Sequence, residues 1–404
     1  MPLPRLPFRT QVTDEPAAID AAAWNALLAR QDAPTPFMRH EYLAALHASG
    51  SAVPETGWTP RFLLLWDGDA LAAACPLYVK PHSYGEYVFD FAWANAHAEH
   101  GLAYYPKAVV AAPFTPVPGS RLLARDAAAR EALARAAVEW CAGQGLSSLH
   151  VLFGDDADHA ACAGAGLMER RQVQFHWTNQ HPRTGARFAS FDDFLASLSQ
   201  DKRKKTRQER RKVREAGVAF RWARGADIGP ADWDFFYRCY ERTYLEHGNA
   251  PYLTRAFFHA MARQMPESWL LFVAEREGQP IASSLIAIGE VQAPANGQNS
   301  TETVAYGRYW GALRRVDCLH FEACYHQPIE WCIQQGVARF EGGAQGEHKM
   351  ARALLPVMTQ SAHWLAHPAF ADAVERFLAR EGPGVEGYLA HLRERSPFRR
   401  APPG

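Results

Sequence analysis

Blocks of hydrophobic and polar residues recur in the same order in the two halves of the chain. Residues 131–146 (EALARAAVEWCAGQGL) and 322–337 (EACYHQPIEWCIQQGV) share the pattern E-A, five residues, then [VI]-E-W-C-x-x-Q-G-[LV]. Each block has the periodicity of a helix that ends at a glycine and passes into an apolar strand. The two strands are predicted over residues 147–153 (SSLHVLF) and 338–343 (ARFEGG).

A second pair of matching segments lies upstream of each helix. Residues 62–79 (FLLLWDGDALAAACPLYV) and 270–288 (LLFVAEREGQPIASSLIAI) each predict two strands joined by a turn that contains a glycine. Two matches in the same order indicate a duplicated unit rather than a chance likeness at one helix end. The predicted fold class is therefore mixed α/β, with tandem domains at residues 1–185 and 186–370 and a helical tail at 371–404.

A strongly basic helix is predicted at the start of the second domain. Ser190 is a suitable N-cap, with Asp193 at the acidic position of a capping box. Residues 201–215 hold nine lysines and arginines and three acids, and Gly217 can end the helix. We interpret residues 202–214 either as a solvated helix face or as a contact for tRNA or another phosphorylated partner.

Composition narrows the class of protein. The chain has 404 residues, of which 48% are hydrophobic and 21% charged, and its formal net charge is zero. These values are typical of a globular protein with two domains, and in a neutral chain any basic patch must be local. The seven cysteines form no CxxC pair and show no zinc-finger spacing, which indicates reduced thiols. No signal peptide, membrane span or metal site is evident, so the chain is expected to be cytoplasmic.

Several stretches resemble the FemAB-like group of tandem acetyltransferase-fold proteins. They read SYGEYVFDFAWANA, APFTPVPG, YGRYWG, HFEACYHQPIEWCIQQG and RFEGGAQGEHKMAR, and the resemblance extends from about Pro36 to His367. The chain is similar in particular to a bacterial branch described as predicted N-acyltransferases or peptidoglycan biosynthesis/recognition proteins. The resemblance implies two domains of the GNAT (acyl-CoA N-acyltransferase) fold, each a twisted mixed sheet flanked by helices. It also implies transfer of an acyl or aminoacyl group to an amine, from acyl-CoA or from aminoacyl-tRNA.

The sequence departs from the GNAT pattern where the CoA pyrophosphate would bind. GNAT enzymes usually have an [RQ]-x-x-G-x-[GA] loop there, and neither half has one between its hairpin and the helix that follows. In the first half Gly119, Ser120 and Arg121 precede a helix, and backbone N–H groups at such a turn can bind a phosphate. In the second half Arg314 and Arg315 lie near a helix start. These five residues are the predicted cofactor-binding candidates, for acyl-CoA as a co-substrate rather than a permanently bound cofactor.

The stretch 341–349 (EGGAQGEHK) has the groups that amine acylation requires. The reaction needs a proton acceptor for the ammonium, a site that holds both reactants and donors for the oxyanion. Three glycines after a predicted strand permit close backbone approach to a ligand. The alternative is a glycine-rich connector with solvated charges. The predicted proton acceptors are Glu341 and His348, and the predicted substrate contacts are Gln345, Glu347 and Lys349.

An aromatic stretch of the first half, residues 82–93 (HSYGEYVFDFAW), is a second candidate. Glu86 could act as an acid or base, and Tyr84 and Asp90 could contact the substrate along a wall of aromatic rings. The alternative is a half-buried strand, because the aromatic residues partly follow a period of two.

The predicted strand YGRYWG contributes two further substrate-binding candidates, Arg308 and Tyr309. Arg308 is a charge among aromatic residues, and it is expected either to pair with an acid such as Glu341 or to bind a carboxylate or phosphate bidentately. No nucleophile is evident, so direct transfer between the reactants is expected.

The sequence supports one leading function and two alternatives. The leading function is a cytoplasmic N-acyltransferase that uses acyl-CoA and a small-molecule or peptide amine. The first alternative is a non-catalytic protein that recognises a peptidoglycan precursor or peptide, which the missing pyrophosphate loop favours. The second is an aminoacyl-tRNA-dependent transferase that uses the basic helix. The oligomeric state is left open.

Overall fold

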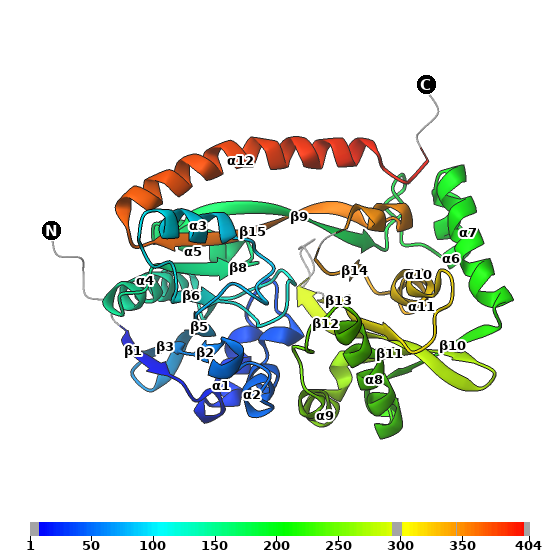
Figure 1. Cartoon of the computed structure of the whole chain (residues 1–404), viewed down its shortest axis with the longest axis horizontal. Coiled ribbons are helices and arrows are strands. Elements are labelled where there is room, and N and C mark those ends of the chain that lie inside the picture. Colours follow the sequence, from blue (N-terminus) through cyan, green and yellow to red (C-terminus); the bar gives the residue numbers. More distant parts are fainter. Residues whose placement is uncertain (1–7, 293–300, 345, 400–404) are drawn as a thin grey trace. The chain divides into compact units, whose positions relative to one another are not determined.

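The structure is a computed structural model that describes residues 8–292, 301–344 and 346–399 (Figure 1). Contacts within the chain divide it into two units, Met1–Gln172 with Met358–Gly387, and Val173–Val357 with Tyr388–Gly404. This division places residues 358–370 in the first unit, whereas the sequence-based boundaries place them in the second. Residues 361–365 belong to the first unit because they pair with the strand at residues 148–152. The sequence-based boundaries stay a prediction.

Two sheets form the first unit. Its strands are β1 (Arg9–Thr13), β2 (Thr59–Pro60), β3 (Phe62–Asp67), β4 (Ala70–Cys75), β5 (Leu77–Lys80), β6 (Lys107–Val110), β7 (Leu123–Ala124), β8 (Ser148–Leu152) and the end of β15 (Leu355–Leu365). One sheet has the order β1-β3-β4-β7, and the other includes β15-β8-β6-β5-β2. β6 and β8 are parallel, whereas β15 is antiparallel to β8 with Ala362 opposite Val151. The predicted hairpin is confirmed as β3 and β4, and Gly68 in its turn has a φ of 59°.

Helices cover the strands of the first unit. They are α1 (Ala21–Leu28), α2 (His40–Ala48), α3 (Phe91–Glu99), α4 (Ala127–Gly143), α5 (Asp156–Gly164) and the 3-10 helices η1 (Pro16–Ala18), η2 (Pro36–Met38) and η3 (Pro54–Thr56). Leu133 and Cys141 of α4 are buried in one core with Leu149 and Val151 of β8. The predicted helix and strand of the first repeat are therefore α4 and β8.

One sheet forms the centre of the second unit. Its strands are the end of β9 (Met168–Thr178), β10 (Val218–Arg224), β11 (Trp269–Arg276), β12 (Gln279–Gln292), β13 (Thr301–Ala312) and β14 (Arg339–Glu341). They follow the order β10-β11-β12-β13-β14-β9. β13 and β14 are parallel, and the other neighbours are antiparallel. The predicted hairpin of this half is confirmed as β11 and β12.

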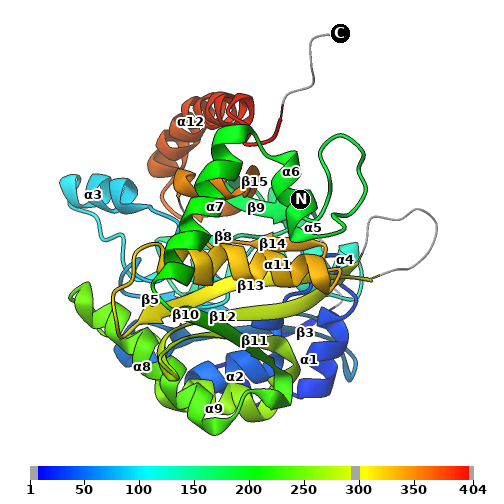
Figure 2. The same ribbon diagram turned by 90° about the vertical axis from the view of Figure 1, so that its right-hand side faces the viewer.

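The second unit also contains the basic helix and the second copy of the repeated helix. Its helices are α6 (Phe191–Ser197), α7 (Gln200–Glu215), α8 (Pro230–Glu246), α9 (Arg255–Gln264), α10 (Leu319–Phe321), α11 (Gln327–Gln334), the π-helix η6 (Glu322–His326) and the 3-10 helices η4 (Gly225–Asp227), η5 (Pro266–Ser268) and η7 (Glu347–Arg352). The last helix, α12 (Pro368–Glu394), includes residues of both units. Figure 2 shows α7 beside α11, to which Arg210 is joined through Glu330.

Local signals in the sequence placed several helix ends correctly. Ser190 caps α6 by accepting a hydrogen bond from the N–H of Asp193, as predicted. The two repeated helices are followed by Gly145 and Gly336, each with a φ of 67°, a conformation that glycine adopts without a steric penalty. Two details differ from the prediction. The basic segment is divided into α6 and α7, and the second repeated helix contains a π-helical turn, η6.

Candidate functional site

A pocket of the second unit lies where β13 extends past the end of β14. The two strands pair from Val304 opposite Arg339 to Tyr306 opposite Glu341, and β13 then continues to Ala312. The pocket has a volume of about 140 Å³, and we call it the β13–β14 pocket. Its lining residues are Ser284, Ile286, Gly307, Arg308, Tyr309, Trp310, His320, Cys324, Tyr325, Phe340 and Gly342. The predicted residues Arg308 and Tyr309 are thus brought to the edge of the glycine-rich segment.

Glu341 is the last residue of β14, and its side chain is buried. Its Oε1 accepts a hydrogen bond from Arg339 Nε at 2.9 Å, and its Oε2 lies 3.8 Å from His176 Nε2. Burial is the largest influence on His176 and lowers the pKa of its imidazole. The pairing of Glu341 with Arg339 replaces the predicted pairing with Arg308, whose guanidinium donates to the Tyr309 hydroxyl at 3.4 Å.

Arg308 occupies a β-bulge. The register between β12 and β13 passes from Leu285 opposite Tyr309 to Ile286 opposite Gly307, so Arg308 is the additional residue at the bulge. A bulge changes the direction of a side chain and is frequent next to functional sites. The bulge explains how a charged residue in a central strand comes to line the pocket.

Lys349 is buried, and it holds the glycine-rich loop. Its Nζ donates hydrogen bonds to the carbonyl oxygens of Gly343 at 3.0 Å and Ala344 at 3.4 Å. Burial lowers the pKa of this ammonium to about 8. Gly342 packs against the same side chain, since a Cβ there would lie 3.4 Å from Lys349 Cδ and 2.4 Å from Leu354 Cδ2.

The other predicted residues of this segment are near the surface. His348 is exposed, its Nε2 lies 3.3 Å from the Tyr325 hydroxyl, and burial lowers the pKa of its imidazole. Glu347 is also exposed and accepts hydrogen bonds from Tyr388 at 2.7 Å and Arg395 at 3.3 Å. Gln345 lies outside the described residues.

Two residues that we did not predict line the β13–β14 pocket with groups suited to acyl transfer. His320 lies in α10, and burial lowers the pKa of its imidazole to about 4. Tyr325 lies in η6, and burial raises the pKa of its phenol, so the hydroxyl keeps its proton. In the sequence both residues belong to a helix-like run that also fits simple packing. Their signal was the polar character of HFEACYH within an otherwise apolar block.

Glu86 and Asp90 lie in a buried ionic cluster of the first unit. Lys107 Nζ donates to Glu86 Oε2 at 2.7 Å and also to Asp90, while Lys80 Nζ lies 3.9 Å from Glu86 Oε1. The four side chains are no more than 2% exposed. Burial raises the pKa of Glu86 to about 7, and the Asp90 charge adds to this effect while the two lysines oppose it. These contacts fix the segment 81–90, so we do not assign either acid to the chemistry.

The aromatic stretch around these acids is not a strand. Residues 81–90 have no regular structure and α3 begins at Phe91, so the half-buried strand considered for this stretch is wrong. Tyr84 is 64% exposed, and its ring centroid lies 6.3 Å from that of Phe91, which lies equally far from Phe89. A row of exposed rings therefore exists, and its role in substrate binding stays a prediction.

Gly119, Ser120 and Arg121 lie in the interior of the first unit. The backbone N–H groups of Arg121 and Leu122 donate to the carboxylate of Asp158 at 2.5 and 3.1 Å. The guanidinium of Arg121 donates to three backbone carbonyl groups. The N–H groups of Gly119 and Ser120 donate to the carbonyl oxygens of residues 153 and 33, each at 3.0 Å. All three N–H groups that we expected to bind a phosphate are therefore bonded within the protein.

Arg314 and Arg315 are exposed in the connection between β13 and α10. Within the described ranges, no carboxylate oxygen lies within 4.0 Å of either guanidinium. Their location after β13 agrees with the predicted place near a helix start.

The cations of α7 line a groove of about 980 Å³ in the second unit. Arg203, Lys204, Arg207, Arg211 and Arg214 line this groove, and we call them the α7 stripe. Their spacing of three and four residues places them on one face of the helix. For the part of the chain that the structure describes, no carboxylate oxygen lies within 4.0 Å of Arg203, Lys204, Arg207 or Arg214, whereas Arg211 is 3.5 Å from Glu215.

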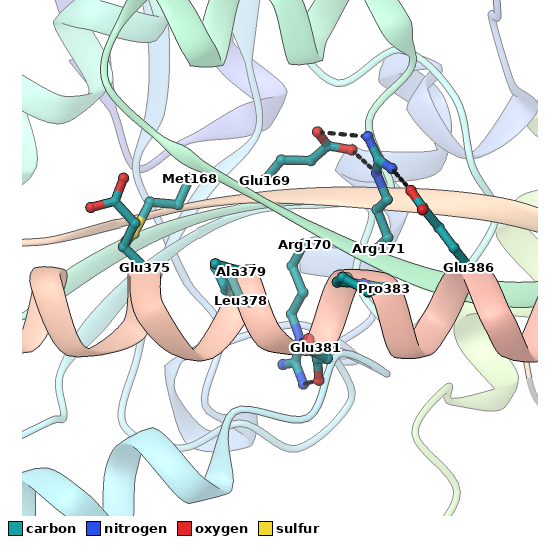
Figure 3. A pocket seen from close by; sticks show the side chains of 11 residues that line it. Met168, Glu169, Arg170, Arg171, Glu375, Leu378, Ala379, Glu381, Pro383 and Glu386 are labelled. Carbon is teal, nitrogen blue, oxygen red and sulfur yellow. Dashed lines mark hydrogen bonds and ion pairs between the residues drawn. The ribbon is translucent and has the colours of Figure 1, made fainter.

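A pocket of about 390 Å³ in the first unit lies between β9 and α12 (Figure 3). Arg170 donates two hydrogen bonds of 2.9 Å to Glu381, and Arg171 donates to Glu169 at 2.6 Å and to Glu386 at 2.5 Å. Figure 3 shows both guanidinium groups joined to these carboxylates. Because the charges are paired with one another, we assign no ligand to this pocket.

Two further features concern metal ions and membranes. The described residues contain no group of three or more His, Cys, Asp or Glu side chains arranged to hold a metal ion. Across residues 8–292, 301–344 and 346–399, no helix has both the length and the apolar character that a membrane crossing requires.

Comparison with solved structures identifies the fold. FemX has a TM-score of 0.52 at 8% identity, over 91% of this chain and 100% of that chain. L-PGS from Bacillus licheniformis has a TM-score of 0.52 at 11% identity, over 91% of this chain and 99% of that chain. A tandem GNAT protein from the clavulanic acid biosynthesis pathway matches with a TM-score of 0.42 at 11% identity, over 89% of this chain and 99% of that chain. The two matches with a TM-score of 0.52 confirm the predicted fold class.

Comparison of the sequence identifies the family. No curated protein matches the sequence significantly. The sequence model of the FemAB-like family, described as peptidoglycan biosynthesis/recognition, matches residues 15–400. Since this match includes both units almost completely, the chain belongs to the FemAB-like family.

Proposed function

We propose that the protein is an N-acyltransferase that moves an acyl group from acyl-CoA to an amine, and that the reactants meet in the β13–β14 pocket. The observation that carries the proposal is that one pocket, beside a stretch of β13 that extends past β14, contains a neutral imidazole and a protonated phenol. Membership of the FemAB-like family supports a transferase of peptidoglycan biosynthesis, with a small-molecule or peptide amine as acceptor. We place this reaction in the cytoplasm.

His320 supplies the proton acceptor in this proposal. An ammonium must lose a proton before its nitrogen can attack the carbonyl carbon of a thioester. With a pKa of about 4, the imidazole of His320 is neutral at pH 7 and free to accept a proton. The first proton of the ammonium passes by way of His320 to solvent, which returns the imidazole to its neutral form. The C–N bond then forms, the C–S bond breaks, and the second proton of the nitrogen passes by way of His320 to the departing thiolate, which leaves as the free thiol.

Tyr325 supplies a hydrogen-bond donor for the carbonyl oxygen. The negative charge that develops on this oxygen is stabilised by donors that are already in place before the reaction. Burial keeps the Tyr325 phenol protonated, and His348 Nε2 at 3.3 Å from the hydroxyl restrains its position. Backbone N–H groups of β13 beyond Tyr306 are suitable further donors.

Cationic residues around the pocket would hold the anionic parts of the reactants. Arg308 lines the pocket itself, and the exposed Arg314 and Arg315 follow on the same strand connection. We assign these two arginines to the phosphates of CoA, since phosphate groups pair well with guanidinium. Lys349 keeps the glycine-rich loop in place, and Glu341 holds Arg339. In this proposal Glu341, predicted as a base, and Lys349, predicted as a substrate contact, are supports of the pocket.

A direct assay tests the proposal. The purified protein is incubated with acyl-CoA donors and a panel of peptide amines, with thiol release and product mass as readouts. His320→Gln should lower kcat by about 100-fold or more, the size of a general-base contribution. His259→Gln, which changes a half-buried histidine of α9 outside the pocket, serves as the control and should leave kcat unchanged. Tight peptide binding without turnover by the unaltered protein would instead support non-catalytic recognition of a peptidoglycan precursor.

A second candidate donor, aminoacyl-tRNA, is favoured by the α7 stripe. From Arg203 to Arg214 the helix extends about 16 Å, at 1.5 Å per residue. A duplex presents about nine phosphates over that length, far more than the compact phosphate groups of one CoA. A linear array of cations suits such a polyanion, and among the described residues no carboxylate oxygen lies within 4.0 Å of four of the five cations of the α7 stripe.

The salt dependence of tRNA binding tests this second candidate. Replacing Arg203, Arg207 and Arg214 with glutamine should weaken binding and reduce the slope of log K against log salt by about 0.7–0.9 for each lost phosphate contact. Lys202→Gln with Lys205→Gln is the control, since these two residues of α7 do not line the groove. If tRNA does not bind at low salt, aminoacyl-tRNA is excluded as the donor.

A further inference from the structure

We infer that Glu209 is a positioning residue for the β13–β14 pocket. Through Arg352 and His326 it fixes two segments, one that carries Tyr325 of the pocket and one that carries His348, the hydrogen-bond partner of Tyr325. The inference rests on the proposed function, and it concerns a residue of α7 that does not itself line the pocket.

Glu209 is an acid on the inner face of a basic helix. The buried residues of α7 are Thr206, Glu209 and Val213, while the α7 stripe lies on another face. A buried carboxylate is unfavourable unless both its oxygens are paired. Glu209 Oε1 accepts a hydrogen bond from Arg352 Nη2 at 2.6 Å, and Oε2 lies 2.9 Å from His326 Nε2. The hydrogen bonds and charges of these partners outweigh burial and lower the pKa of Glu209.

Arg352 links α7 to the segment that carries His348. Its Nη1 donates to the backbone carbonyl oxygen of His348 at 2.9 Å, within η7. Its Cζ lies 3.5 Å from the ring centroid of Phe321 and 5.7 Å from that of Tyr325. One buried guanidinium therefore contacts α7, η7 and the rings next to the pocket.

The π-helix η6 is held at both ends by consecutive residues of α7. Arg210 Nε donates to Glu322, the first residue of η6, at 3.1 Å, and Glu209 pairs with His326, the last residue. Single π-helical turns are frequent at functional sites. Between these two contacts lies Tyr325, whose hydroxyl faces His348. The two α7 contacts thus determine where the proposed oxyanion donor sits.

The variant Glu209→Gln tests this role by separating kcat from KM. Glutamine keeps the size of the side chain but loses the charge, so Arg352 and His326 lose their common anchor. We expect kcat to fall by about tenfold or more, because small displacements of reacting groups are costly, with KM for acyl-CoA changed less than about threefold. Glu215→Gln, on the exposed end of the same helix, should leave both values within about twofold of the unaltered protein.

A double variant shows whether Glu209 positions η7 or only neutralises the buried charge of Arg352. Glu209→Gln with Arg352→Gln removes both buried charges, so its melting temperature should rise above that of Glu209→Gln alone. We expect kcat to stay low, because the link between α7 and η7 is still absent. Recovery of both kcat and melting temperature would overturn the inference, since charge balance alone would then explain Glu209. If Glu209→Gln fails to fold, Arg352→Lys takes its place, because it keeps the charge but loses the second hydrogen bond.

A measurement that needs no activity keeps this inference separate from the proposed function. Amide hydrogen exchange over residues 347–352 should be faster in Glu209→Gln, with β11 unchanged as the internal reference. Unchanged exchange over 347–352 would overturn the inference. If the unaltered protein transfers no acyl group, the proposed function fails, while the exchange result still decides whether Glu209 fixes η7.

Discussion

Replacing Lys107 with methionine should strongly destabilise the first unit. Lys107 is the cation between two buried carboxylates, and its Nζ donates to Glu86 at 2.7 Å, to Asp90 and to Ser83 at 2.8 Å. Methionine retains most of the length of the side chain but none of its charge. Lys80 cannot take over, because its Nζ is 3.9 Å from Glu86 and is held by the carbonyl oxygens of residues 57 and 84.

The size of this effect follows from burial and from the pKa of Glu86. Removing one partner of a buried ion pair costs about 3–5 kcal/mol, because the remaining charge is uncompensated. Two carboxylates lose their partner here, but the Glu86 pKa of about 7 means that this acid can take up a proton at neutral pH at little cost. One uncompensated charge, that of Asp90, remains. We therefore expect about 3–5 kcal/mol rather than twice that amount.

Calorimetric melting at neutral pH measures the effect. A loss of this size corresponds to a melting temperature lowered by about 6–20 °C for a unit of 150–250 residues. The control is Arg125→Met, which breaks an exposed ion pair of 2.8 Å with Asp67 and should leave the melting temperature almost unchanged, since exposed ion pairs contribute little to stability. Equal shifts in the two variants would refute the reasoning, because burial would then have no influence on the cost of losing the cation.

Two further predictions follow from pKa and packing. Between pH of about 4.5 and about 7 the folded protein keeps a proton on Glu86 that the unfolded chain has lost, so the free energy of unfolding of the unaltered protein falls as pH rises. Glu86→Gln lacks this titration, so its free energy of unfolding should rise relative to that of the unaltered protein over the same range. Urea unfolding over that pH range measures the difference, and a relative stability that falls with pH would contradict it. Gly311→Ala should cost about 1–3 kcal/mol, because its Cβ would lie 1.9 Å from the carbonyl oxygen of Cys239. Gly382→Ala is the control, because no heavy atom lies within 4 Å of the added Cβ, and it should be neutral or stabilise α12 by up to about 1 kcal/mol. Equal melting temperatures for the two glycine variants would count against this explanation.

The repeated elements could be predicted from the sequence because their signals are local. A helix period, a following glycine and an apolar strand identify α4 with β8 and α11 with β14 without knowledge of the rest of the fold. The return of the chain to the first unit could not be predicted in this way. Residues 361–365 of β15 pair with residues 148–152 of β8, and pairing between distant segments leaves no mark on local periodicity.

The candidate site, like the fold, could be predicted only in part from the sequence. Glu341, Arg308 and Lys349 stand out because polar residues interrupt an apolar strand or follow its end. His320 and Tyr325 did not stand out, because their chemical importance depends on lining a pocket with β13. Lys107 was missed for a related reason. A lysine at the start of a short apolar strand has no local explanation until the segment 81–90 brings Glu86 and Asp90 to it.

The basic helix α7 is more than a solvated, charged surface, because it also carries a buried acid. A helix that is merely a solvated face has no need of an acid on its buried side, and burying one there is unfavourable without partners. α7 nevertheless buries Glu209, and its partners Arg352 and His326 are themselves buried beside the β13–β14 pocket. The same helix carries the α7 stripe along the groove, and within the residues that the structure describes only Arg211 of these five cations has a carboxylate oxygen within 4.0 Å. One helix therefore carries both the α7 stripe and the acid Glu209, whose partners Arg352 and His326 lie in the segments of the proposed site.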